Sequence, residues 1–389
     1  MIAVTANRLY TPLECVELPL LLIEDGVVAE VSSRTARQIP DGARVMDFAE
    51  AVLAPGFVDI HNHGGAGHDV MSDDSAGLAA LERLLAAHGV TGYFPTTVTA
   101  PVDKTLSALD RLAGEIEKAE RNQKSAEGRA RPLGIHLEGP FISHVRRGVH
   151  PPGNLLPPTL AAFDRFWQAA RGRIRMLTIA PELEGAEEVI AEAASRKVCV
   201  SVGHSDADLE TTRAAIAAGA RHATHTFNAM RPLSHRDPGI IGAVLTDTRL
   251  SADIVADGIH LDPAIVQLFL KAKGAEGAVL ISDATAATGM PEGRYRLGSL
   301  EVEVKDGRVT SGGTLAGSVL TLDRAVRNVM EFAHWDLQAA LRLASLNPAR
   351  AGGLSDRGKI EAGSPADIVV LTPAGEVKAT IVGGVPREM

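Results

Sequence analysis

Short apolar segments alternate with segments of helical periodicity through the middle of the chain. Eight apolar segments are almost continuously hydrophobic, which is typical of parallel strands buried on both faces. These predicted strands are 57–61, 92–97, 133–138, 174–180, 198–203, 223–227, 252–256 and 278–283. The predicted helices are 75–88, 102–120, 159–170, 185–196, 206–218 and 262–273, with two more at 318–330 and 337–346. The alternation predicts an α/β fold, a (β/α)8 barrel with eight such units, and an open doubly wound sheet is the alternative.

Both ends of the chain have a different pattern, in which short apolar stretches are separated by turns. Asp25 and Gly26 lie between two apolar stretches within 20–31, and this dipeptide is the strongest short-range hairpin signal. The C-terminal end has apolar stretches at 366–371 and 377–382. Neither end is large enough to form a stable sheet alone, so we expect both to join in one small β-sandwich domain.

Two segments interrupt the alternation of strands and helices. Residues 118–131 are rich in charged and small side chains, which indicates a solvated connection. Residues 295–313 contain a second Asp-Gly hairpin, which we place as an insertion after the eighth strand. The expected domains are therefore a small β domain, 1–54 with 356–389, and a barrel domain, 55–355.

Polar side chains lie where five of the predicted strands end. They are His61 and His63 on the first strand, Glu138 on the third, His204 on the fifth, His225 on the sixth and Asp283 on the eighth. Active sites of (β/α)8 barrels are built at the carboxyl ends of the strands. Imidazole and carboxylate groups that converge there are suitable ligands for one or two divalent ions.

Each of these residues also has an ordinary structural interpretation. The first-strand histidines can be hydrogen-bonded loop residues, Glu138 can cap a loop, and His204 can be a core histidine. A buried carboxylate is costly unless it is paired or metal-bound, which favours ligation by Glu138. His222 and His225 face opposite sides of the sixth strand, so we assign His225 to the site and His222 to packing or ligand support. Asp283 is the candidate general base, a role that needs a carboxylate close to the attacking water.

Charge and composition restrict the partners and the location. The formal net charge is -9, so the chain lacks the overall positive charge that binds nucleic acid or an anionic membrane. Any anion must therefore bind in a pocket that is itself basic. Two cysteines cannot form a disulfide framework, and no apolar run reaches about 18 residues. The first residues also lack the pattern of a signal peptide. We therefore expect a cytoplasmic protein without nucleic-acid or membrane partners.

Several motifs together resemble the amidohydrolase superfamily. The motifs are Pro-Gly-Phe-Val-Asp-Ile-His-Asn-His at 55–63, Asn-Pro-Ala-Arg at 347–350 and Gly-Ser-Pro-Ala-Asp-Ile-Val at 363–369. Within the superfamily, the chain resembles the family of N-acetylglucosamine-6-phosphate deacetylases at 136–141, 147–150, 203–205, 224–230 and 282–284. The resemblance covers essentially the whole chain.

This resemblance implies a fold and an activity. The fold is a metal-dependent (β/α)8 barrel with a small β domain from both termini. The activity is removal of the acetyl group from N-acetylglucosamine 6-phosphate, which gives glucosamine 6-phosphate and acetate. The alternatives are a deacetylase of a related sugar phosphate such as N-acetylgalactosamine 6-phosphate, another amidohydrolase, or a barrel without activity. The predicted fourth strand, 174–180, contains no lysine that could be carbamylated, which counts against the cyclic amidases.

The resemblance also implies roles for individual residues. Glu138, His204 and His225 would be the main metal ligands, and Asp283 the catalytic acid and base. His150 would lie near the acetyl carbonyl and join the catalytic set. The residues expected to bind the substrate are Asn228, the Ala229 backbone, Arg236, His260, Leu315 and His150.

Two further implications concern the metal and the assembly. Some members of the family have Gln-x-Asn on the first strand and bind one metal, whereas His61 and His63 here make a second ion possible. We expect zinc, with iron, manganese or cobalt as alternatives. In that family the arginine that matches Arg236 comes from the neighbouring subunit, which implies a homodimer.

Overall fold

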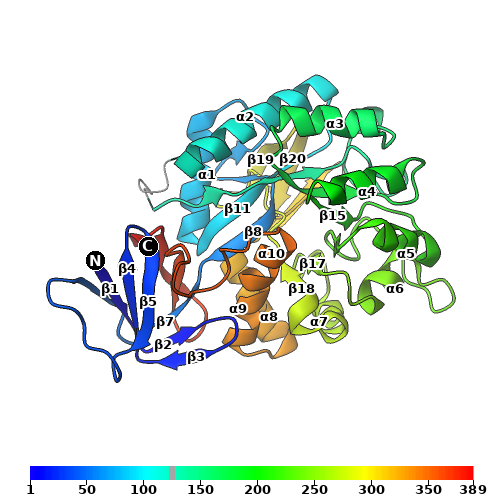
Figure 1. Ribbon diagram of the computed structural model, residues 1–389. Coiled ribbons are helices and arrows are strands. Elements are labelled where there is room, and N and C mark those ends of the chain that lie inside the picture. The colour runs from blue at the N-terminus through cyan, green and yellow to red at the C-terminus, as the bar shows by residue number, and fades with distance from the viewer. Residues whose placement is uncertain (122–127, 389) are drawn as a thin grey trace.

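A curled parallel sheet covered by helices is the central feature of the computed structural model, which describes residues 1–121 and 128–388 (Figure 1). Its consecutive parallel strands are β8 (Phe57–Asn62), β11 (Val90–Thr97), β13 (Ile135–Glu138), β14 (Ile174–Ile179), β15 (Cys199–Val202) and β16 (His222–Ala223). The short strand β12 (Arg131–Pro132) lies beside β11. Most residues of these strands are buried, which explains their continuous apolar pattern.

Two more parallel strands, β17 (Ala252–Ile254) and β18 (Ala278–Leu280), form a separate pair. Backbone hydrogen bonds link this pair to the curled sheet on both sides. The N–H of Thr226 donates to the carbonyl of Asp253 over 2.9 Å, and the N–H of Asp283 donates to the carbonyl of His61 over 3.0 Å. The carboxyl ends of the first and eighth predicted strands therefore lie side by side.

The sixth predicted strand is wrong in its extent. The structure places β16 at His222–Ala223, and residues 224–227 turn instead of continuing the strand. His225 has a φ of 29° and Phe227 a φ of 81°, and a strand cannot contain such angles. The eighth strand likewise ends at Leu280, before the predicted boundary at 283. In both places the backbone turns where the polar side chains lie.

Helices cover the outside of the parallel strands (Figure 1). They are α1 (Ser75–Ala87), α2 (Val102–Arg121), α3 (Leu160–Ala169), α4 (Ala186–Ser195), α5 (Leu209–Ala218), α6 (Gly239–Thr246), α7 (Pro263–Gly277), α8 (Leu322–Ala333), α9 (Leu337–Ala344) and α10 (Leu346–Ala351). α6 was not predicted because it is apolar almost throughout and shows no amphipathic spacing. The connection predicted at 118–131 is also wrong at its start, because α2 extends to Arg121; residues 122–127 lie outside the described residues. None of the described helices is long and apolar enough to span a membrane.

The strands from the two ends of the chain lie together beside the helix-covered sheet (Figure 1). One four-stranded sheet has the order β5 (Val27–Ser33), β4 (Pro19–Glu24), β1 (Ile2–Thr5) and β6 (Arg44–Asp47). A six-stranded sheet has the order β25 (Val385–Glu388), β24 (Val377–Val382), β23 (Ile368–Leu371), β7 (Val52–Pro55), β2 (Arg8–Tyr10) and β3 (Cys15–Glu17). β7 pairs with β23, and Leu21, Leu53 and Ile368 join one apolar cluster. The predicted hairpin at Asp25 and Gly26 is confirmed by the antiparallel pairing of β4 with β5.

The predicted insertion is a four-stranded antiparallel sheet. Its strands are β19 (Gly293–Leu297), β20 (Leu300–Lys305), β21 (Arg308–Ser311) and β22 (Thr314–Leu315). Asp306 and Gly307 form the predicted turn between β20 and β21, with φ of 51° and 72°. The sheet extends two residues beyond the predicted boundary at 313, so Leu315 belongs to its last strand.

Candidate metal centre

Five imidazoles and two carboxylates meet beyond the carboxyl ends of the parallel strands. They are His61, His63, His150, His204, His225, Glu138 and Asp283, and their exposed fractions range from 0% to 7%. Because ionisable groups are rarely buried in such numbers without a compensating charge, this cluster requires a functional explanation.

Glu138, at the end of β13, is the centre of the first ligand group. Its Oε1 atom lies 3.2 Å from His204 Nε2 and 3.1 Å from His225 Nε2. The two Nε2 atoms are themselves 3.1 Å apart. One ligand atom from each of the three residues lies within 4.8 Å of the others, so together they can hold a metal ion.

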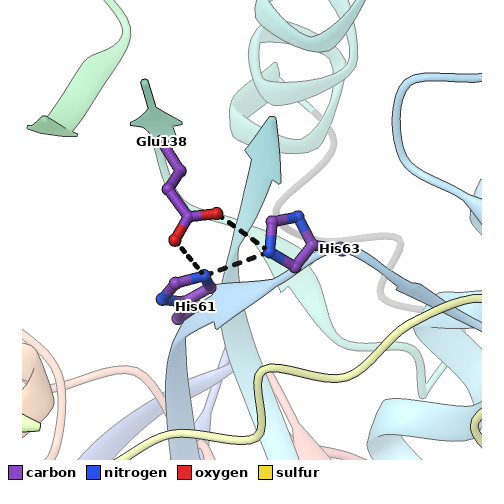
Figure 2. Close-up of side chains that lie close together, drawn as sticks. All are labelled: His61, His63 and Glu138. Carbon is purple, nitrogen blue, oxygen red and sulfur yellow. Dashed lines mark hydrogen bonds and ion pairs between the residues drawn. The ribbon is translucent and has the colours of Figure 1, made fainter. Parts of the chain in front are cut away.

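His61 and His63 form a second ligand group with the same glutamate (Figure 2). Their Nε2 atoms are 3.1 Å apart, and they lie 3.5 Å and 3.3 Å from Glu138 oxygens. Asp283 Oδ1 is also close to this pair, 3.5 Å from His61 Nε2 and 3.3 Å from His63 Nε2. Glu138 is therefore shared by both groups, and Asp283 is next to the second one.

Hydrogen bonds to backbone carbonyls orient two of the imidazoles. His204 Nδ1 lies 3.0 Å from the carbonyl oxygen of Arg146, and His63 Nδ1 lies 3.0 Å from that of Thr96. Since a carbonyl can only accept, each Nδ1 carries a proton, and in the neutral ring Nε2 presents its lone pair to Glu138. Lone pairs and a carboxylate that converge in this way fit a divalent cation with nitrogen and oxygen ligands.

The two carboxylates keep their negative charge in this buried position. Burial by itself raises the pKa of Glu138 and of Asp283. The nearby His61 and the hydrogen-bonded imidazoles outweigh burial and hold both pKa values below their ordinary range. Both carboxylates are therefore ionised and can serve as oxygen ligands.

The imidazoles respond differently to the same environment. Burial lowers the pKa of His63 and of His225, but hydrogen bonds to the carboxylates outweigh it and raise the values to about 10 and about 9. Burial prevails at His204 and lowers its pKa to about 4, so this ring is neutral without a bound cation. A cation bound at these groups would displace the Nε2 protons of His63 and His225.

A cavity of about 420 Å³ opens onto these groups. Of the residues expected to bind substrate, His150, Asn228, Ala229, His260 and Leu315 line it, together with Asp283. Leu315 reaches the cavity from the inserted sheet. The parallel strands and the insertion therefore both contribute walls to one site.

His150 presents a hydrogen-bond donor to this site. Its Nδ1 atom lies 3.3 Å from the backbone nitrogen of Thr99 and 2.8 Å from the Thr99 hydroxyl. Because the backbone N–H can only donate, Nδ1 accepts, and the proton of the neutral ring lies on Nε2. That Nε2 atom is 3.6 Å from Glu138 Oε2, which places the donor beside the metal ligands.

Comparison with known proteins identifies the family. A model described as "Amidohydrolase family" matches residues 52–386. The chain belongs to the amidohydrolase family. The resemblance stated from the sequence is therefore confirmed, and this membership together with the two ligand groups indicates a divalent metal centre.

Individual amidohydrolase relatives are similar over nearly the whole chain. The chain is 39% identical to N-acetylglucosamine-6-phosphate deacetylase of Bos taurus, with 90% of this chain and 86% of that protein covered. It is 38% identical to N-acetylgalactosamine-6-phosphate deacetylase of Escherichia coli O157:H7, with 97% of each covered. Among solved structures, a mutant N-acetyl-D-glucosamine-6-phosphate deacetylase from Mycobacterium smegmatis in complex with N-acetyl-D-glucosamine-6-phosphate has a TM-score of 0.91 and 36% identity, with 99% and 98% covered.

Arg236 is the one predicted substrate-binding residue of this amidohydrolase that does not line the cavity. It lies exposed in the loop 231–238, and it forms no hydrogen bond or ion pair within 1–121 and 128–388. The adjacent carboxylate, Asp237, pairs with Arg231 and not with Arg236. The guanidinium of Arg236 is thus available to a group outside this chain.

Two other histidines of the strands lie outside the ligand groups. His136 Nδ1 faces the carbonyl of Ile60 at 3.2 Å, and its Nε2 lies 2.8 Å from the Thr178 hydroxyl. His222 pairs with Asp253. Asp253 is not among the predicted site residues, although a charged residue inside an apolar strand is a signal that it needs a buried partner.

Proposed function

We propose that this amidohydrolase is a metal-dependent deacetylase that converts N-acetylglucosamine 6-phosphate and water into glucosamine 6-phosphate and acetate. The observation that carries the proposal is the sharing of Glu138 by two ligand groups at one cavity, with Asp283 beside them. Curated relatives named as deacetylases of N-acetylated sugar phosphates support the substrate class.

The residues divide the reaction between them. A divalent ion held by Glu138, His204 and His225 would supply Lewis acidity, which acidifies water and polarises a carbonyl. Asp283 takes the proton of the water that attacks the acetyl carbon, and then gives it to the amine nitrogen as the C–N bond breaks. His150 donates its Nε2 proton in a hydrogen bond to the carbonyl oxygen as negative charge develops there. Acetate and the amino sugar phosphate leave.

An unpaired donor supports the binding of a phosphate or sugar oxygen. Asn228 Nδ2 is buried and has no hydrogen-bond partner among the described residues, although it lines the cavity. A buried unpaired donor is costly, so an acceptor on the substrate would stabilise this arrangement. We assign phosphate binding to Asn228, the Ala229 backbone and His260, with Arg236 from a neighbouring subunit, and we place Leu315 against the sugar.

The two ligand groups support a proposal for the identity and number of the ions. We propose one ion at Glu138, His204 and His225 and a second at His61, His63 and Glu138. Nitrogen and oxygen ligands in a buried site suit zinc, and they also accept iron, manganese or cobalt.

We also propose that the parallel strands close into a (β/α)8 barrel over 55–355. The hydrogen bonds from β17 and from the end of β18 to the curled sheet support closure. The pairing of β7 with β23 supports a small β-sandwich domain from 1–54 and 356–389. The cytoplasmic location stays a prediction from the sequence.

The proposed activity is tested by acetate release before and after removal of the metal. Protein stripped with a chelator should release no acetate from N-acetylglucosamine 6-phosphate, and addition of zinc, manganese, iron or cobalt should restore release. Metal content per chain, measured on the same samples, identifies the ion. N-acetylgalactosamine 6-phosphate is the comparison substrate, because one relative is named for it. Equal release from N-acetylglucosamine without phosphate, or none from either phosphate, would refute the proposal.

Arg236→Ala should raise KM for the sugar phosphate and leave kcat nearly unchanged, because Arg236 would contact the phosphate and not the reacting carbonyl. Steady-state kinetics measure both. A mixture of Arg236→Ala with Asp283→Asn tests the dimer, because a mixed dimer contains one site with both residues intact. If the mixture at low substrate concentration is more active than the summed activities of the two variants measured separately, Arg236 acts across the interface. An unchanged KM removes Arg236 from the site.

A further inference from the structure

A fully buried carboxylate lies behind the ligand His225. Asp253, in β17, has an exposed fraction of 0%, and its Oδ2 atom lies 2.8 Å from Nε2 of the equally buried His222. Its other oxygen, Oδ1, accepts the backbone N–H of His225. His222 is itself held by Ser251, whose hydroxyl lies 2.7 Å from Nδ1. One carboxylate therefore connects a buried histidine to the backbone of a proposed metal ligand.

The backbone of His225 needs such support. Its φ of 29° is in the left-handed region, where a residue with a side chain is held at a cost of about 1–3 kcal/mol. β16 ends two residues earlier, and the N–H groups on either side, those of Thr224 and Thr226, donate to the carbonyls of Val202 and Asp253. The hydrogen bond to Asp253 is the contact that holds the N–H of His225 in place.

The ring of His225 has less support of its own than the rings of two other ligands. His204 and His63 each donate Nδ1–H to a backbone carbonyl, which fixes the ring. His225 Nδ1 is buried without a hydrogen-bond partner in the described part of the chain. The direction of its Nε2 atom toward Glu138 therefore depends on the backbone conformation.

We propose that Asp253, held by His222, is a positioning residue that sets the metal affinity of the group formed by Glu138, His204 and His225. The inference rests on the proposed metal site. Asp253 does not line the cavity, and its carboxylate oxygens face His222 Nε2 and the backbone N–H of His225. It acts through the His225 backbone. Mutation of a residue that orients a metal ligand typically lowers metal affinity about 10- to 100-fold.

The test measures metal affinity without substrate. Zinc is titrated against a chromophoric chelator with wild-type protein, Asp253→Ala and Asp253→Asn. We expect zinc affinity to fall about 10- to 100-fold in Asp253→Ala, because no acceptor remains for the His225 N–H. Asp253→Asn keeps a carbonyl oxygen for that N–H and should lose less. With zinc in excess, KM for the sugar phosphate should stay at the wild-type value in both variants.

Asp323→Asn provides a matched control. Asp323, in α8, is also buried, with an exposed fraction of 5%. It lies 3.1 Å from Nδ1 of His88, which follows α1, and this pair lies outside the ligand groups. We expect it to lower the melting temperature without changing zinc affinity.

The outcomes separate this inference from the proposed function. If wild-type protein binds zinc and Asp253→Ala binds it equally well, or if Asp323→Asn weakens binding to the same extent, the positioning role is refuted. If Asp253→Ala does not fold, Asp253→Asn and His222→Gln test the positioning role instead. The role requires that at least one of them weakens zinc binding more than Asp323→Asn does. Absence of zinc binding by the wild-type protein refutes the metal centre itself and this role with it.

Discussion

Asp283→Asn should lower kcat about 10²- to 10⁴-fold while the protein still folds and binds metal. Asparagine has the size of aspartate and keeps an oxygen where Asp283 Oδ1 lies, 3.3 Å from His63 Nε2. It cannot take a proton from water or return one to the leaving amine, so only the proton transfers are lost. Acetate release under saturating substrate measures the effect, and metal content per chain shows that the centre is intact.

Asp262→Asn is the control for this variant. Asp262 caps α7 by accepting the N–H of Ala264 over 2.8 Å, and asparagine caps a helix equally well. Activity of this control should equal that of the wild-type protein. If Asp283→Asn also keeps near-wild-type turnover with its metal bound, Asp283 is not the acid and base of the reaction.

The residues of the site were more predictable than the backbone that carries them. Glu138 could be singled out because a carboxylate at the end of an apolar strand is costly without a partner, and the structure places it between two groups of imidazoles. His204, His225 and Asp283 have φ of 47°, 29° and 50°. No sequence pattern predicts such a backbone conformation at residues other than glycine. The direction of these side chains could therefore not be read from strand alternation.

Contacts between segments that are distant in the sequence also limited the prediction of the site. Leu315 reaches the cavity because the inserted sheet folds over the strand ends, and nothing in its local sequence determines that placement. Asp253 has a detectable local signal, a charge within an apolar strand, but its partners His222 and His225 lie about 30 residues away in sequence. A hydrophobic pattern predicts which face is buried, whereas the partner of a buried charge depends on the tertiary structure.

Glu138→Gln should remove both ions, because both ligand groups include this residue. Oε1 faces His204 and His225, and Oε2 lies 3.3 Å from His63 Nε2. An amide supplies one neutral oxygen and replaces the other with an NH₂ group, which cannot bind a cation. We expect metal content per chain to fall close to zero and acetate release to fall to that of chelator-treated protein.

The double variant His61→Asn with His63→Asn separates the two groups. It leaves Glu138, His204 and His225 in place, so it should keep one ion per chain and lose only the second. Glu210→Gln is a surface control, because Glu210 is an exposed partner of Arg213, and such pairs contribute little. If Glu138→Gln retains an ion with wild-type affinity, the carboxylate does not join the two groups. If the double variant loses all metal, the first-strand histidines bind the essential ion, and the assignment of that ion to Glu138, His204 and His225 is wrong.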